Sequence, residues 1–78
     1  SGSQICIADS GNNRVLIWNG IPDENIDPIT VLGQQNMSGK DPSPATNGLN
    51  NPKGCQFVDN QLIVTDTDNN RVVIYESL

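Results

Sequence analysis

An internal repeat limits the folds open to this chain more than any other feature. Residues 4–21 and 61–78 align without a gap at an offset of 57, and seven of 18 positions are identical. The identical pairs are Gln4/Gln61, Asp9/Asp66, Asn12/Asn69, Asn13/Asn70, Arg14/Arg71, Val15/Val72 and Ile17/Ile74. A duplicated segment of this kind predicts two equivalent supersecondary units.

Each copy has the pattern of a β-hairpin. In the first copy, apolar residues at 5–8 and 15–18 flank a polar tetrad at 10–13 that contains Gly and Asn, which suit tight turns. Extended to the whole chain, these signals predict an all-β fold with antiparallel strands. The six predicted strands cover residues 4–8, 14–18, 28–32, 54–58, 61–65 and 71–75.

The segments between the strands are predicted to be loops. Residues 22–27 are polar and turn-forming, and residues 34–51 contain repeated Gly and Pro without an apolar period. A loop of this length is either functional or a packed surface excursion. If the loop is a contact surface, deletion of residues 38–46 is expected to weaken partner binding and to leave folding unchanged.

The repeated Asp and Arg residues are predicted to be structural rather than catalytic. Asp9 and Asp66 are placed to accept hydrogen bonds from turn amides, as in an Asx-turn. Arg14 and Arg71 are placed to pair with these carboxylates from across each hairpin.

The strands are apolar at nearly every position instead of at alternate ones, which is typical of sheets covered on both faces. Seventy-eight residues cannot cover both faces of both hairpins, whereas stacked copies can. The isolated chain is therefore expected not to be a stable monomer.

The motif Asp-x-x-Asn-Asn-Arg-Val before an apolar and aromatic strand resembles the signature of NHL repeats, which are blades of a β-propeller. The segments ADSGNNRVLIWN, VLGQ, LNNPKG and LIVTDTDNNRVVIY are similar to the long-period bacterial variety. The resemblance implies partial blades at 4–33 and 53–78, joined by a long inter-blade loop at 34–52, with 1–3 as a linker. It also implies that Trp18 and Tyr75 pack between blades, a role favoured over stacking on a ligand.

Compared with a complete blade, the first unit lacks its inner strand and the second lacks its outer strand. Since closed propellers have about four to eight blades, the chain is expected to be a fragment or to complete a sheet with other chains. The expected partners are further propeller blades or other copies of the chain, with a protein partner through loop 34–51. The resemblance also implies a secreted, periplasmic or cell-surface protein.

Composition excludes several classes of function. Four Lys and Arg against nine Asp and Glu give a net charge of −5, which disfavours nucleic acid as a partner. The absence of His removes His-based triads and imidazole metal sites, and no apolar run is long enough to predict a membrane span. No cofactor is expected.

Two further features leave alternatives open. Asp66, Asp68 and Asn70 imitate the start of a calcium loop, but Arg71 and Ser77 replace the required Gly and Glu, so a capped turn is favoured. The two cysteines, at 6 and 55, fit either buried thiols in apolar strands or a disulfide between neighbouring strands.

Taken together, the sequence predicts a non-catalytic propeller segment that serves as a scaffold or protein-interaction module. The alternative is a piece of a multi-blade propeller enzyme or carbohydrate-binding protein whose site lies in other blades. The predicted inner strand at 54–58 carries no His, Asp or Glu, which argues against a catalytic residue within this segment.

Overall fold

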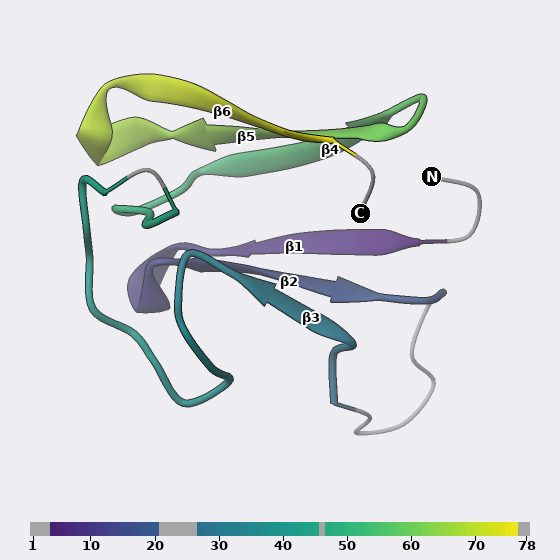
Figure 1. The fold of residues 1–78 in the computed structure, drawn as a ribbon, viewed down its shortest axis with the longest axis horizontal. Coiled ribbons are helices and arrows are strands. Elements are labelled where there is room, and N and C mark those ends of the chain that lie inside the picture. The colour runs from purple at the N-terminus through teal and green to yellow at the C-terminus, as the bar shows by residue number, and fades with distance from the viewer. Residues whose placement is uncertain (1–3, 21–26, 46, 77–78) are drawn as a thin grey trace.

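The computed structural model describes residues 4–20, 27–45 and 47–76, and the chain there forms two three-stranded antiparallel sheets (Figure 1). The first sheet has the order β1-β2-β3, with β1 at Ile5–Asp9, β2 at Arg14–Trp18 and β3 at Thr30–Leu32. The second has the order β4-β5-β6, with β4 at Gly54–Val58, β5 at Gln61–Asp66 and β6 at Arg71–Glu76. The all-β class and the six strands are confirmed; the described residues form no closed propeller. The expected linker at 1–3 lies outside the described residues. Of the expected turn at 22–27, the described residues include Asp27 alone.

The two copies of the repeat adopt the same hairpin in the same register. Asp9 pairs with Arg14 where β1 meets β2, and Asp66 pairs with Arg71 where β5 meets β6. Each turn consists of a short 3-10 helix, η1 at Ser10–Asn12 or η2 at Thr67–Asn69, and one left-handed Asn. Asn13 has φ 56° and Asn70 has φ 54°, a conformation that Asn tolerates better than most residues.

The third strand is shorter than predicted. It was expected at 28–32 but begins at Thr30. Pro28 has no amide hydrogen to donate to a neighbouring strand, although the Ile29 amide still donates to the Ile17 carbonyl at 2.8 Å. The two-residue turn between β4 and β5 is present, with Asp59 at φ 54°.

The two sheets pack face to face, with β1 in contact with β4 (Figure 1). Side chains that alternate along β2 and β5 point into the interface, because successive strand residues face opposite sides. The fully buried cluster consists of Val15, Ile17, Leu49, Leu62 and Val64. Burying an aliphatic side chain of this size stabilises a fold by about 1.5–3 kcal/mol, so this interface is the hydrophobic core.

Within the described ranges, each sheet is covered by other residues on one face only. On the second sheet, Val72 and Ile74 point away from the first sheet and are 60% and 54% exposed. On the first sheet, Ile7 is 47% exposed on the side opposite the core. The continuous apolar runs of the sequence therefore correspond to one buried face and one exposed apolar face per sheet. The pattern predicted that both faces of each sheet are covered, and within the described residues one face of each sheet stays exposed.

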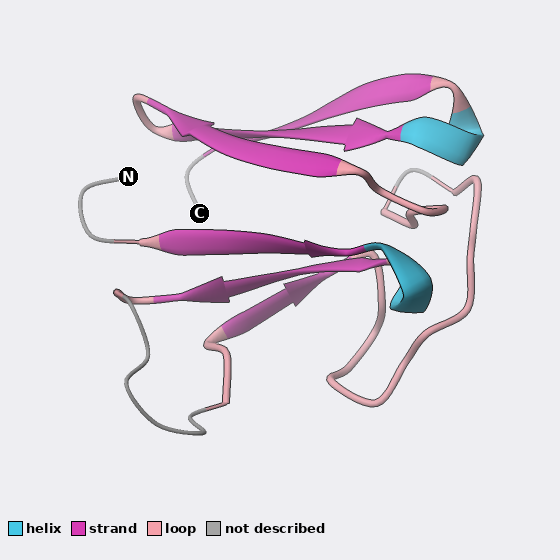
Figure 2. Cartoon of the chain, turned by 180° about the vertical axis from the view of Figure 1, so that it is seen from behind, coloured by secondary structure: helices cyan, strands magenta, loops and turns pink. Residues whose placement is uncertain are grey.

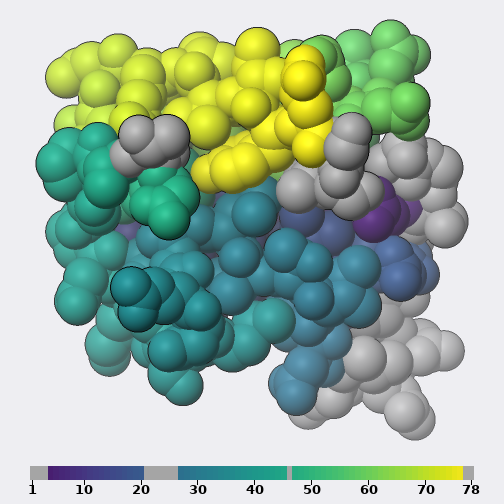
Figure 3. All heavy atoms as spheres, in the orientation of Figure 1, coloured from purple at the N-terminus to yellow at the C-terminus, as the bar shows by residue number. Residues whose placement is uncertain are grey.

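The long loop is packed against both sheets. A parallel bridge joins Gly33 to Gly48, so the segment between them leaves and returns at neighbouring points. Leu49, directly after this bridge, is fully buried in the core. Figure 3 shows loop atoms, in teal, lying against the yellow-green and yellow atoms of the second sheet. The loop is therefore a packed excursion, and a contact role for it stays a prediction.

Gly33 is required by both conformation and space. Its φ is 93°, and a Cβ atom there would lie 2.7 Å from Leu49 Cδ1. Gly11 in the first turn has nothing within 4 Å of the same position. We expect Gly33→Ala to lower the free energy of unfolding by about 2–4 kcal/mol, from backbone strain and overpacking together.

The matched control is Gly11→Ala, which we expect to change the free energy of unfolding by less than about 1 kcal/mol. Urea unfolding followed by tryptophan fluorescence measures both variants. Equal urea midpoints for the two variants would contradict the close packing of Gly33 on Leu49.

Candidate functional site

The two repeated turns lie at the same end of the two sheets, beside the long loop (Figure 2). Each turn presents an Asp at the end of one strand, an Asn within the 3-10 helix, a left-handed Asn and an Arg at the start of the next strand. The hairpin gathers the four positions around one turn, and the left-handed Asn of the first copy and both Arg side chains reach the loop. This group of residues, at 9, 12–14, 66 and 69–71, is called the turn motif below.

In the first copy, the Asp is held by two donors. Arg14 Nε donates to Asp9 Oδ2 at 2.8 Å, and Asn12 Nδ2 donates to the same oxygen at 3.1 Å. Arg14 Nη1 also donates to the backbone carbonyl of Met37 in the loop. The guanidinium therefore joins the hairpin to a loop that lies more than 20 residues downstream.

The left-handed Asn of the first copy binds the loop at both ends. Asn13 Nδ2 donates to the Lys40 carbonyl at 3.0 Å, and Asn13 Oδ1 accepts from the Asn51 amide at 2.8 Å. Its own carbonyl accepts from Gln34 Nε2 at 2.9 Å. One residue thus fixes the beginning, the middle and the end of the loop.

In the second copy, the Asp has three donors. Arg71 Nε donates to Asp66 Oδ2 at 2.7 Å, and Asn69 Nδ2 donates to the same oxygen at 2.9 Å. The Asn50 amide donates to Asp66 Oδ1 at 2.7 Å. Asn69 Nδ2 also donates to the Ser43 carbonyl at 2.8 Å. Both carboxylate oxygens are therefore occupied by protein donors.

The Arg71 guanidinium extends the second copy into the loop. Its Nη atoms donate to the carbonyls of Pro44 at 3.2 Å, Ala45 at 2.9 Å and Gly48 at 2.7 Å. A planar guanidinium can reach several acceptors at once, which suits it to holding irregular backbone in place.

The role of the turn motif differs from the sequence-based expectation in one respect. The Asp–Arg pairs are present, but neither Asp caps its 3-10 helix through a side-chain hydrogen bond to a turn amide. The amide groups that reach Asp9 and Asp66 within the turn belong to the side chains of Asn12 and Asn69. The Asx-turn interpretation was therefore wrong. Within each turn, the amide of the left-handed Asn donates to the backbone carbonyl of Ser10 or Thr67.

The contacts argue against the expectation that residues 38–46 can be deleted without an effect on folding. Backbone carbonyls of this segment accept hydrogen bonds from Asn13, Asn69 and Arg71. A deletion there removes acceptors from both copies of the turn motif. The loop is part of the folded framework.

The two Asp residues differ in burial although their sequence contexts are equivalent. The Asp66 side chain is fully buried, whereas that of Asp9 is 28% exposed. Burial alone raises the pKa of an Asp, but in Asp66 the hydrogen bonds from Asn50, Asn69 and Arg71 and the guanidinium charge outweigh it and lower the pKa. The pKa of Asp9 is lowered in the same way, by Asn12 and Arg14 against a burial effect that raises it.

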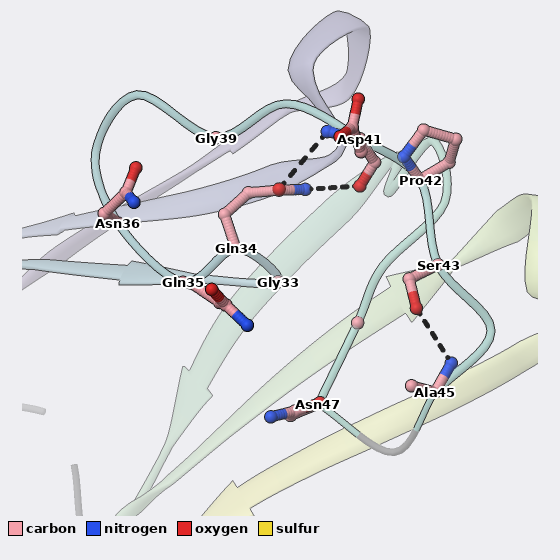
Figure 4. A pocket seen from close by; sticks show the side chains of 11 residues that line it. Gly33, Gln34, Gln35, Asn36, Gly39, Asp41, Pro42, Ser43, Ala45 and Asn47 are labelled. Atoms are coloured by element: carbon pink, nitrogen blue, oxygen red, sulfur yellow. Dashed lines mark hydrogen bonds between the residues drawn. The ribbon is translucent and has the colours of Figure 1, made fainter.

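The loop encloses a concavity of about 530 Å³ on its own surface (Figure 4). Gln34 crosses its floor, donating to the Asp41 carbonyl at 2.7 Å and accepting from the Asp41 amide at 3.2 Å. The other lining side chains include Gln35, Asn36 and Asn47. The lining offers amide groups and one carboxylate, with no aromatic ring for a sugar to stack on.

The remaining candidate residues take different positions. Tyr75 packs against the core cluster with its hydroxyl buried and without a hydrogen-bond partner, while Trp18 is half-buried on the opposite face of its own sheet. Cys6 and Cys55 are free thiols that pack against the same cluster. Sequence position is equivalent for Trp18 and Tyr75, but only Tyr75 lies in the interface between the sheets.

The geometry of the turn motif suits it to fixing backbone in place. In the part of the chain that the structure describes, no three His, Cys, Asp or Glu side chains gather as a metal site. Asp66, the first position of the imitated calcium loop, uses both oxygens for protein donors.

Neither of the described helices is long and apolar enough to span a bilayer.

Two contributors to this site carry little signal in the sequence. Leu49 is a single apolar residue in a polar loop, and only its position directly after Gly48 marks the return of the chain to the core. Gln34 ties the loop to Asn13 and to Asp41, and it belongs to the VLGQ segment that carries part of the family resemblance. That segment was the available signal.

The buried Asp66 is expected to contribute more stability than the exposed Asp9. Asp66→Ala leaves Arg71 Nε and the Asn50 amide without their acceptor, which costs about 3–5 kcal/mol for a broken buried pair. Asp9→Ala is the matched control and should cost about 1 kcal/mol, as for a more exposed pair. Urea midpoints measure the difference, and equal losses would contradict the assigned burial.

The lowered pKa values of the two Asp residues predict loss of stability in acid. Their contribution is fully present above the unfolded pKa of about 3.9 and is lost as pH falls through the folded values. Urea midpoints measured between about pH 7 and pH 2 should therefore fall most steeply below about pH 4. Asp66→Asn should flatten this fall, and an unchanged slope would show that Asp66 is not its source.

A scan against protein-family models, a search of curated proteins and a search of solved structures each found no match. The likeness to NHL repeats therefore rests on the repeated motif of the sequence, and the function it implies belongs among proposals.

Proposed function

We propose that this chain is a non-catalytic scaffold module of the NHL type, in which two successive β-propeller units stack and leave both outer faces for equivalent sheets. The occupants of those faces are further blades or other copies of the chain. The single observation that carries the proposal is that the faces left exposed are the repeat equivalents of the faces that are buried. By its family resemblance, the module is assigned to a secreted, periplasmic or cell-surface protein.

The exposed face of the second sheet matches the buried face of the first. On the first sheet, Val15 and Ile17 face the core. An offset of 57 converts them to Val72 and Ile74, which are identical residue types and point to solvent on the second sheet. The apolar face that is buried in the first sheet is thus repeated in the second sheet, where it is exposed.

The converse holds for the other outer face. Leu62 and Val64 of the second sheet are fully buried against the first. Their equivalents on the first sheet are Ile5 and Ile7, and Ile7 is 47% exposed. The exposed face of the second sheet therefore matches the buried face of the first sheet, and the exposed face of the first sheet matches the buried face of the second. Such a head-to-tail contact either closes into a ring or continues as an open array.

The turn motif supports the same arrangement. Arg14 of the first copy contacts loop backbone that follows it, at Met37, whereas Arg71 of the second copy contacts loop backbone that precedes it, at residues 44, 45 and 48. If the two copies are superposed at the 57-residue offset, the carbonyls bound by Arg14 and those bound by Arg71 occupy different positions, so the two arginines do not compete for the same acceptors. One motif in a longer array would hold the loop on each side of it.

The loop surface is proposed as the second contact region, for a protein partner. Its amide-lined concavity is polar and open, which suits hydrogen bonding to a peptide backbone rather than apolar burial. Because the loop is hydrogen-bonded to both turn motifs, substitution of exposed side chains such as Gln35 and Asn47 replaces deletion as the way to test it.

Association through the exposed face of the second sheet is directly testable. We expect Ile74→Lys to shift the chain toward monomer and to weaken self-association at least about tenfold, because it places a charge in an apolar contact. Met37→Lys is the matched control, since Met37 is 42% exposed but lies in the loop after β3 and on neither sheet. Light scattering after size exclusion, over a range of protein concentrations, gives the mass of each species.

The wild-type chain and Met37→Lys should both exceed the 8.4 kDa monomer mass at high concentration. A wild-type chain that remains a monodisperse monomer and shows one sharp thermal transition would contradict the proposed stacking.

A further inference from the structure

The two cysteines of the chain meet across the interface between the sheets. Cys6 lies on β1 and Cys55 on β4, the two strands through which the sheets contact each other (Figure 1). Their side chains lie close enough to interact, since the Cys6 thiol is one of the groups that raise the pKa of Cys55. They are 49 positions apart in the sequence and belong to different sheets, so only the packing of the sheets brings them together.

The register of each sheet explains why both thiols point into the interface. Cys6 pairs with Ile17 on β2, and Cys55 pairs with Val64 on β5. Both of these partners are fully buried core residues. Residues directly opposite in an antiparallel pair lie on the same face, so both cysteines share the core face of their sheets.

We propose that Cys6 and Cys55 form a modification site, at which a small-molecule disulfide such as oxidised glutathione converts the two thiols into a disulfide that links the two sheets. This inference does not depend on the proposed stacking with other sheets, because both residues belong to the interface within the chain.

The reaction is an ordinary pair of thiol–disulfide exchanges. One thiol loses its proton, and its thiolate attacks a sulfur of oxidised glutathione, which forms a mixed disulfide and releases one glutathione thiolate. The second cysteine, deprotonated in turn, attacks the protein sulfur of that mixed disulfide and releases the second glutathione. The two protein thiols are oxidised by two electrons, and one oxidised glutathione is reduced to two molecules of glutathione.

The link is confined to this one interface. The repeat equivalent of Cys6 is Ile63, which lies on the outer side of the second sheet. A disulfide therefore links the two sheets within the chain. The exposed face of the second sheet has an isoleucine, Ile63, at the position equivalent to Cys6, and so has no thiol there. Stacking on that face remains noncovalent at this position.

Burial, with the hydrogen bond and charge of Cys6, raises the pKa of the Cys55 thiol to about 12. Exchange requires a thiolate, so attack by Cys55 is slow near neutrality and the exchange is best brought to equilibrium at about pH 8.5.

The test compares the equilibrium between thiols and disulfide in the folded and the unfolded chain. The full chain, folded as judged by circular dichroism, is equilibrated in buffers of defined oxidised-to-reduced glutathione ratio, with and without concentrated urea. Acid quenching and mass spectrometry then count the intramolecular disulfide, which is two hydrogen atoms lighter than the dithiol. We expect the folded chain to favour the disulfide at least about 100-fold more than the unfolded chain, because the fold holds the thiols together.

Variants and a stability measurement complete the test. Cys6→Ser and Cys55→Ser should each form only the mixed disulfide with glutathione, whereas the oxidised wild-type chain should melt about 10 °C or more above the reduced chain. The proposal is overturned if the folded chain gives no more intramolecular disulfide than the unfolded chain, or gives only mixed or intermolecular disulfides. Oxidation without a rise in melting temperature would show that the link distorts the interface and would also overturn it.

Discussion

The buried carboxylate of Asp66 is the interaction on which the second half of the structure depends. A charged group without solvent is stable only if its hydrogen bonds are satisfied, and here Asn50, Asn69 and Arg71 supply them. These three donors come from the segment before β4, from the turn and from the start of β6. The carboxylate thus fixes the hairpin, and through Arg71 it also fixes the loop that packs against it.

The strands could be predicted from the sequence because their signals are local. β-branched runs separated by Asn-containing turns specify hairpins over fewer than 20 residues, and the 57-residue repeat gives the same pattern twice. The Asp–Arg pairs follow from the same local register, since the two residues face each other at the open end of the turn. β3 was overestimated where Pro28 cannot donate to a neighbouring strand.

The binding of the loop could not be predicted in the same way. Arg14, Arg71 and Asn69 hold it through backbone carbonyls, and every residue carries a carbonyl, so the sequence does not mark which ones are used. The burial of Leu49 likewise depends on the bridge between Gly33 and Gly48, which joins residues 15 positions apart. Long-range contacts of this kind come from the tertiary arrangement, and no short pattern encodes them.

The shared loop has a consequence for how the molecule unfolds. Although no strand of one sheet pairs with a strand of the other, the turn motifs of both sheets bind the same stretch of backbone. Loss of either sheet releases the loop and with it the partners of the other turn motif. The coupling between neighbouring units is therefore large relative to the intrinsic stability of one unit, which is the condition for a repeat array to melt in one step rather than unit by unit.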